Sequence, residues 1–304
     1  MLKFFRSMGC AGRLGIFLLM FIAALILSSI IMTVMLLATG NATQPTTQFL
    51  LFSQGITQIL TFLVPALVFA WLFNGNANTF FQTSFKKWQF APALLAILLI
   101  ITSIPMIDLL SNWNTGLHLP QSLKSVEDTL RASGEKSDVL VKSFMALPGW
   151  GYFLLNLLIM AVIPAVCEEF VFRGVVQKTM AEWLRNPHVA IIIVAAIFSI
   201  THFDLFLFVP RFVLGIFLGY IYYYTKTIWA STLAHFANNA TVVVLFYCNS
   251  LGLCNINPTD MQLPQPVLFA IVSTVVTISI LIFLIKICNK NTQNYEKSPT
   301  SETK

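Results

Sequence analysis

Residues 15–38 read GIFLLMFIAALILSSIIMTVMLLA and contain no charged side chain. A helix of about 20 apolar residues is long enough to cross the hydrocarbon core of a bilayer. The stretch is too long for the apolar part of a cleaved secretion signal. We therefore predict an uncleaved first membrane span.

The rest of the 304-residue chain has the same character. Charged residues make up 10% of it and hydrophobic residues 57%, and the mean hydropathy is +0.79. Soluble domains carry about 25% charged residues, so the composition excludes an ordinary soluble enzyme, a disordered chain and a collagen-like fibre. The apolar runs are too continuous for the alternating strands of a membrane β-barrel. We predict an all-α fold, a polytopic transmembrane helical bundle.

Hydropathy predicts about eight spans in this bundle. They lie near 15–38, 49–73, 91–111, 150–178, 188–208, 211–225, 227–247 and 266–287. Lys and Arg occur before the first span, after the second, fourth and eighth, and between the sixth and seventh, whereas the loops 39–48 and 248–265 carry neither. By the positive-inside rule, both termini are predicted to be cytoplasmic.

The net charge of +6 fits this topology. No basic patch interleaved with aromatic residues occurs in the sequence, so we expect no nucleic-acid partner. The lipid bilayer is the expected partner of the apolar spans. The short cytoplasmic connections and the small size favour a multi-pass protein of a bacterial cytoplasmic (inner) membrane.

The spans divide the chain into three regions of one membrane domain. Residues 1–148 hold three spans and a long outer loop, in which 122–133 is predicted to be an amphipathic helix, either on the outer membrane surface or simply solvated. Residues 149–247 form the predicted catalytic core. Residues 248–304 add the last span and a polar tail, 291–304, that is predicted to be disordered.

Polar and ionisable side chains concentrate between residues 168 and 239. An ionisable side chain at the centre of a membrane helix costs about 2.5–3.5 kcal/mol on insertion scales, so each one is a candidate for function. The group comprises Glu168, Glu169, Arg173, His202, Asp204, Arg211, His235, Asn238 and Asn239.

The stretch EEFVFRG contains the first charges of this group. It places Glu169 and Arg173 one helical turn apart, acid before base, which favours an ion pair. Glu168 points about 100° away from Glu169 on a helix and lacks that partner. One carboxylate is therefore expected to be satisfied structurally and the other to remain free. The alternative is that all three charges form a packing ion pair near a helix end.

The two histidines of the group each share a helix face with a residue four positions away. His202 follows Phe198, and His235 precedes Asn239. Counting along the helices from the nearest predicted turns puts Glu168 at a similar depth to both imidazoles. We expect these side chains to converge in a pocket that is reachable from the cytoplasmic side.

Such a pocket suits hydrolysis of a peptide or amide bond. A carboxylate in apolar surroundings can take a proton from water, an imidazole can protonate a leaving amine, and a second imidazole with an amide can hold an oxyanion. Glu168, His202 and His235 could equally bind Zn²⁺ with an open fourth position. The sequence leaves zinc and metal-free hydrolysis open. It lacks the HExxH and GxSxG motifs and a second deep Asp near Asp204.

Two neighbouring features are predicted to be structural. Gly215 and Gly219 form a GxxxG motif, which favours close packing of helices within the fold. Arg211 is expected to pair with Asp204 or to face lipid headgroups.

Three motifs in chain order resemble the CAAX-protease and bacteriocin-processing family of intramembrane endopeptidases, which are type II CAAX prenyl endopeptidase-like. They are EExxxR from Glu168, FxxxH from Phe198 and HxxxN from His235. The resemblance covers roughly residues 150–247 and includes the stretch LGIFLGYIYYYTKTIWASTLAHFANN. It implies a multi-helix membrane fold.

The resemblance also implies roles. Glu168 would activate the water with the assistance of His202, and His235 and Asn239 would stabilise the oxyanion. The other two charged residues of EExxxR would be supporting residues. The family has been described both as metalloproteases and as metal-free glutamate proteases, so zinc stays open here too. Bacteria generally lack prenylated CAAX proteins, so the CAAX substrate is not carried over.

We therefore predict an intramembrane endopeptidase that acts on a membrane-associated peptide or protein substrate. Two alternatives remain. One is a non-enzymatic bacteriocin-immunity or membrane scaffold protein with the same pocket. The other is a proton-coupled transporter with a Glu/His relay, against which the lack of visible internal repeats counts.

Overall fold

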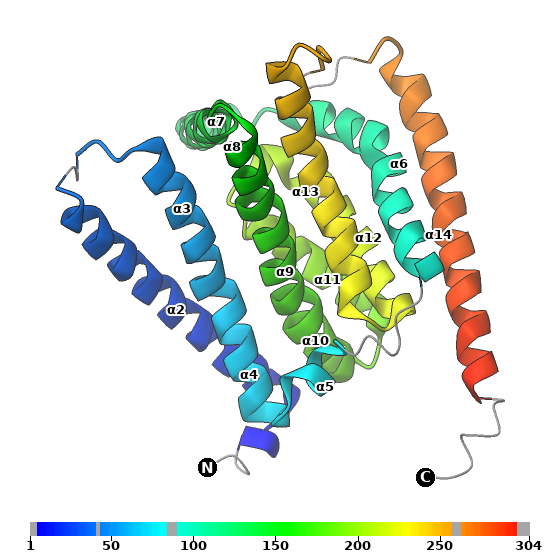
Figure 1. The fold of residues 1–304 in the computed structure, drawn as a ribbon. Coiled ribbons are helices and arrows are strands. Elements are labelled where there is room, and N and C mark those ends of the chain that lie inside the picture. The colour runs from blue at the N-terminus through cyan, green and yellow to red at the C-terminus, as the bar shows by residue number, and fades with distance from the viewer. Residues whose placement is uncertain (1–4, 41–42, 84–89, 257–262, 297–304) are drawn as a thin grey trace.

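The computed structural model describes residues 5–40, 43–83, 90–256 and 263–296, and over these residues the chain forms helices and no strands (Figure 1). The described helices before the motifs EExxxR, FxxxH and HxxxN are α2 (Cys10–Ala38), α3 (Thr47–Gln58), η1 (Ile59–Leu63), α4 (Val64–Asn74), α5 (Ala77–Phe81), α6 (Phe90–Thr115), η3 (Gln121–Leu123) and α7 (Lys124–Met145). All three predicted spans of this half are helical.

The second half contains the helices that carry the motifs. They are α8 (Trp150–Asn156), η4 (Leu157–Val162), α9 (Ile163–Glu169), η5 (Phe170–Gln177), α10 (Lys178–Leu184), α11 (Pro187–Ile200), η6 (Leu205–Leu207), α12 (Phe208–Thr225), α13 (Ile228–Ser250) and α14 (Pro266–Glu296). Here α8 to α10 form one continuous rod.

The helical membrane bundle is confirmed. Six of the described helices or rods are long and apolar enough to cross a membrane, and α11 is a shorter apolar helix. The number of spans and the side on which the termini lie stay predictions. Helix α2 begins and α14 ends at the same end of the bundle (Figure 1).

The tail differs from the prediction. Helix α14 continues to Glu296, into the polar stretch 291–304 that was expected to be disordered. Residues 291–296, NTQNYE, continue the helix because they include neither Pro nor Gly, the residues that most disfavour a helix. Residues 297–304 lie outside the described part, and the division into three regions stays a prediction.

Helix α11 is too short to cross the bundle. Its 14 residues span roughly 21 Å at 1.5 Å per residue, compared with about 30 Å of hydrocarbon. The chain turns back at residues 201–204, with Phe203 in the left-handed region at φ 53°. The turn that carries His202 therefore lies within the length of the longer helices and not at their ends.

The GxxxG motif packs α12 tightly against α11, as predicted. A Cβ atom at Gly215 would lie 3.0 Å from Ala195 Cβ, and one at Gly219 would lie 2.8 Å from Ile191 Cγ2. Side chains larger than hydrogen would separate the two helices at these points.

Helix α7 is longer than the predicted helix at 122–133 and lies across the end of the bundle away from the start of α2 (Figure 1).

Helix α7 is attached there through Glu127, whose side chain is 1% exposed. The carboxylate accepts hydrogen bonds from His118 Nδ1 at 2.8 Å, Arg131 Nε at 2.9 Å and Leu119 N at 2.9 Å. The Arg131 guanidinium lies 3.8 Å from the ring centre of Phe206 in η6. Helix α7 is thus tied both to the α6–α7 connection and to η6.

This attachment should depend on pH. Hydrogen bonds from His118, Arg131 and Leu119 lower the pKa of Glu127 from 4.5 to about 2 in the folded protein. A carboxylate with a lowered pKa stabilises the fold above its ordinary pKa, and this contribution is lost as the pH falls from 4.5 toward 2. We expect hydrogen exchange of the α7 amides, corrected for the intrinsic pH dependence of exchange, to accelerate over that window.

Glu127→Gln should accelerate α7 exchange at neutral pH and abolish the acid transition. The matched control is Glu135→Gln, because Glu135 is exposed on the same helix. Equal exchange in both variants would contradict the attachment through Glu127.

Candidate active site

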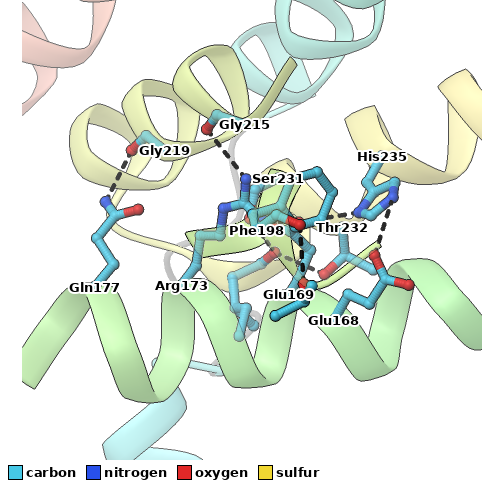
Figure 2. Close-up of polar contacts among 12 residues, drawn as sticks. Glu168, Glu169, Arg173, Gln177, Phe198, Gly215, Gly219, Ser231, Thr232 and His235 are labelled. Carbon is cyan, nitrogen blue, oxygen red and sulfur yellow. Dashed lines mark hydrogen bonds and ion pairs between the residues drawn. The ribbon is translucent and has the colours of Figure 1, made fainter. Parts of the chain in front are cut away.

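A buried ion pair lies at the centre of the motif region. Arg173 Nη1 donates to Glu169 Oε1 at 2.7 Å, and the two side chains are 1% and 0% exposed (Figure 2). Arg173 Nη2 also donates to the carbonyl oxygen of Gly215 at 3.1 Å. The predicted pairing of Glu169 with Arg173 is therefore present, and it joins η5 to α12.

His235 approaches both glutamates of EExxxR. Its Nδ1 donates to Glu169 Oε1 at 3.0 Å, and its Nε2 lies 3.8 Å from Glu168 Oε2 (Figure 2). The ionised carboxylate of Glu169 can only accept a hydrogen bond, so neutral His235 carries its proton on Nδ1. Its Nε2, which then bears a lone pair, faces Glu168. The sequence did not indicate that Glu169 would bind His235 as well as Arg173.

Glu168 has a partner that the sequence analysis missed. Gln58, the last residue of α3, donates from Nε2 to Glu168 Oε1 at 2.7 Å across 110 positions of sequence. A polar amide inside a predicted membrane span was the available signal, although Gln54 in the same span carries it equally.

His202 lies near the same site without bonding directly to it. Its Nδ1 donates to the carbonyl oxygen of Phe198 at 2.7 Å, and its side chain is exposed. The Phe198 ring contacts both imidazoles edge-on, with centroids 4.9 Å from His202 and 5.9 Å from His235. Within the described part of the chain, no hydrogen bond joins His202 to Glu168.

Asn239 lies one turn beyond His235 on α13 and is half-buried. Its Oδ1 accepts a hydrogen bond from the amide of Asn238 at 3.1 Å. The structure thus brings Glu168 and His235 close together, whereas the hydrogen bonds of His202 and Asn239 go to other groups.

The three candidate zinc ligands do not form a metal site. Among the residues that the structure describes, no three His, Cys, Asp or Glu side chains converge closely enough to hold a metal ion. The Nδ1 hydrogen bonds of His235 to Glu169 and of His202 to a carbonyl oxygen leave both Nε2 atoms available, as in metal-ligating histidines. It is the lack of convergence of the three side chains that does not fit a zinc centre.

The helices that carry these residues are locally widened. Stretches of π-helix occur at η1, directly after Gln58, at η4 and at η5, directly after Glu169. Prolines at 65 and 164 follow η1 and η4, and their missing N–H groups leave carbonyls of the preceding turn without a helical donor. Such wide turns are frequent at functional sites because they re-aim neighbouring side chains.

A cavity of about 590 Å³ opens beside the site, between α6, α7, η6, α12 and α13. Asn238, Asp204 and Arg211 are among its lining residues. Arg211 pairs with Asp204 at 3.3 Å, one of the two arrangements expected from the sequence. This cavity lies at the α7 end of the bundle. Access from the end that holds the termini stays a prediction.

The buried ion pair should dominate folding stability. Arg173→Met leaves Glu169 without its main counter-charge, and removing one partner of a buried pair costs about 3–5 kcal/mol. We expect a large fall in the thermal unfolding temperature of the detergent-purified protein.

Arg13→Met is the matched comparison, because Arg13 pairs at 3.7 Å with Glu182, whose side chain is 60% exposed. Exposed pairs contribute about 0–1 kcal/mol, so a similar loss in both variants would contradict the central role of the Glu169–Arg173 pair.

The fold and the site together define a polytopic helical membrane protein with a buried Glu/His centre. Residues 150–241 match the family model described as type II CAAX prenyl endopeptidase Rce1-like. A Bacillus subtilis (strain 168) protein with the name "Putative membrane peptidase YdiL" is 24% identical over 202 residues, which are 66% of this chain and 76% of that protein. No solved structure matches the chain significantly.

These matches confirm the resemblance to the CAAX-protease and bacteriocin-processing family that the three motifs indicated. They support a membrane protease. All the motif residues discussed above fall within the matched region, whereas Gln58 lies outside it.

Proposed function

We propose that this protein is an intramembrane endopeptidase that hydrolyses a peptide bond of a membrane-associated substrate through a water activated by Glu168. The observation that carries the proposal is the 3.8 Å separation between Glu168 Oε2 and His235 Nε2. This distance is too long for a direct hydrogen bond and suits a water shared by both atoms. The Glu168 side chain is 12% exposed, so the water would be activated in a site largely shielded from bulk solvent.

In the proposed reaction, the oxygen of the water bonds to the substrate carbonyl carbon while Glu168 takes a proton from that water. The C–N bond then breaks, and the leaving amine receives a proton from Glu168 or His202. The exposed side chain of His202 can reach a bound substrate, since only Nδ1 is engaged by the protein.

Charge on the carbonyl oxygen is stabilised by donors on α13. His235 would donate from Nε2 in its protonated form, and Glu169 at Nδ1 compensates the imidazolium charge. Asn239 supplies a neutral amide one turn further along the helix. Glu169 and Arg173 act as supporting residues, since both are buried and paired with each other.

The substrate would enter through the cavity beneath α7, which reaches Asn238 beside Asn239. Because the matched relative is a bacterial membrane peptidase by its name, we extend the proposal to a bacterial cytoplasmic membrane. A prenylated substrate is not part of the proposal.

The central test uses purified protein in detergent micelles with fluorescein-labelled casein as the probe. Glu168→Gln, His202→Ala and His235→Ala should each lower the cleavage rate by about 10²–10⁴-fold, the usual contribution of acid–base groups. Thermal unfolding near the wild-type temperature would show that the Glu168 variant is folded. Glu182→Gln, an exposed change on α10, serves as the control and should cleave normally.

Comparison of protein N-termini in cells carrying the wild type or Glu168→Gln would identify natural cleavage sites. Cleavage of casein by folded Glu168→Gln at the wild-type rate would refute the proposed role of Glu168, whereas absence of cleavage by the wild type would favour a non-enzymatic role such as immunity or scaffolding.

We propose that the hydrolysis is metal-independent, because the donor atoms around Glu168 do not converge as zinc ligands. Casein cleavage should survive incubation with 1,10-phenanthroline or EDTA, and elemental analysis of the purified protein should find well below one zinc per chain. Stoichiometric zinc together with loss of activity on chelation would contradict this part of the proposal.

A further inference from the structure

Among the described residues outside the family-like region 150–241, Gln58 makes the one hydrogen bond to Glu168. The amide nitrogen lies 2.7 Å from Glu168 Oε1, and Gln58 is 9% exposed. Only the nitrogen of an amide can donate to a carboxylate, so the orientation of the Gln58 side chain is set by chemistry. A short bond from a buried donor to a charged acceptor belongs to the stronger class of hydrogen bonds.

The backbone brings α3 close to the helix of Glu168 for this contact. Gly55 lies one turn before Gln58 on the same face, and a Cβ atom there would lie 3.4 Å from Ile159 Cγ2 in η4. On the other side, Thr61 in η1 bonds the hydroxyl of Ser28 in α2 at 2.9 Å. Helix α3 is therefore held between its neighbours at the level of Gln58.

The two oxygens of Glu168 consequently have different surroundings. Oε1 is fixed by Gln58, and Oε2 is directed toward His235 Nε2 at 3.8 Å. Rotation of the carboxylate would break the bond to Gln58. In the described part of the chain, Glu168 has no arginine or lysine partner comparable to Arg173, so Gln58 is the donor that defines how its carboxylate is turned.

We infer that Gln58 is a positioning residue for Glu168, which it orients so that Oε2 faces His235. This inference rests on the proposed function for its kinetic consequence, whereas the hydrogen bond itself can be tested without catalysis. It adds α3, a helix outside the three motifs, to the machinery that holds the site.

The spectroscopic test uses protein labelled with ¹³C-glutamate. Subtracting the infrared spectrum of Glu168→Gln from that of the wild type isolates the carboxyl band of Glu168. We expect this band to shift in Gln58→Met, which keeps the chain length but removes the donor. Gln54→Met is the matched control, because Gln54 is exposed one turn earlier on α3, and it should leave the band in place.

The kinetic test uses the same variants with fluorescein-labelled casein. Gln58→Met should lower kcat by about 10–100-fold, the range for loss of a residue that orients a reacting group, while KM stays within about twofold. Gln58→Asn keeps the amide but shortens it by one carbon, so it should fold like the wild type and still lose activity. It replaces the Met variant if that one fails to fold.

An unshifted band, or wild-type kcat in folded Gln58 variants, would overturn this inference. Active Glu168→Gln would instead refute the proposed mechanism, in which Glu168 activates the water. Inactive Glu168→Gln combined with fully active Gln58→Met would overturn only the role of Gln58, so the two failures are distinguishable.

Discussion

The buried carboxylate of Glu169 is the constraint on which the rest of the site depends. A carboxylate with no exposed surface needs compensation for several kcal/mol of lost hydration. Arg173 on η5 and His235 on α13 provide it at 2.7 and 3.0 Å, and Arg173 continues to a carbonyl of α12. One charge therefore fixes the relative positions of three helices. Glu168 directly precedes Glu169 in the chain, so the same contacts also limit the direction of the Glu168 side chain.

The two adjacent glutamates differ in how strongly the protein engages their carboxylates. Glu169 is committed to an ion pair and an imidazole, and its loss would leave other charges buried. Glu168 accepts one hydrogen bond on one oxygen and has its other oxygen 3.8 Å from a ring nitrogen. A group that is held but not neutralised keeps its capacity to take a proton, which is the arrangement that functional sites commonly show.

A second polar cluster, around Glu127, is stabilised in the same way at the α7 end of the bundle. The nearly fully buried carboxylate accepts hydrogen bonds from a His, an Arg and a backbone N–H, and the Arg also contacts Phe206. Phe206 follows closely on the turn that holds His202. The cavity is lined by Arg131 of this cluster and by Asn238 on α13, three residues after His235.

The sequence by itself determined the helical membrane bundle, because apolar runs about 20 residues long have few other stable arrangements. It also determined the Glu169–Arg173 pair and the GxxxG packing, since both depend on spacing within one helix. Only the tertiary structure decided the contact between Gln58 and Glu168, the binding of His235 to Glu169 and the end of the bundle at which the cavity opens. These depend on which faces of distant helices meet and on how far α11 extends. Spacing along the chain does not specify either, because helix packing and the π-helical turns rotate side chains by amounts that no local pattern records.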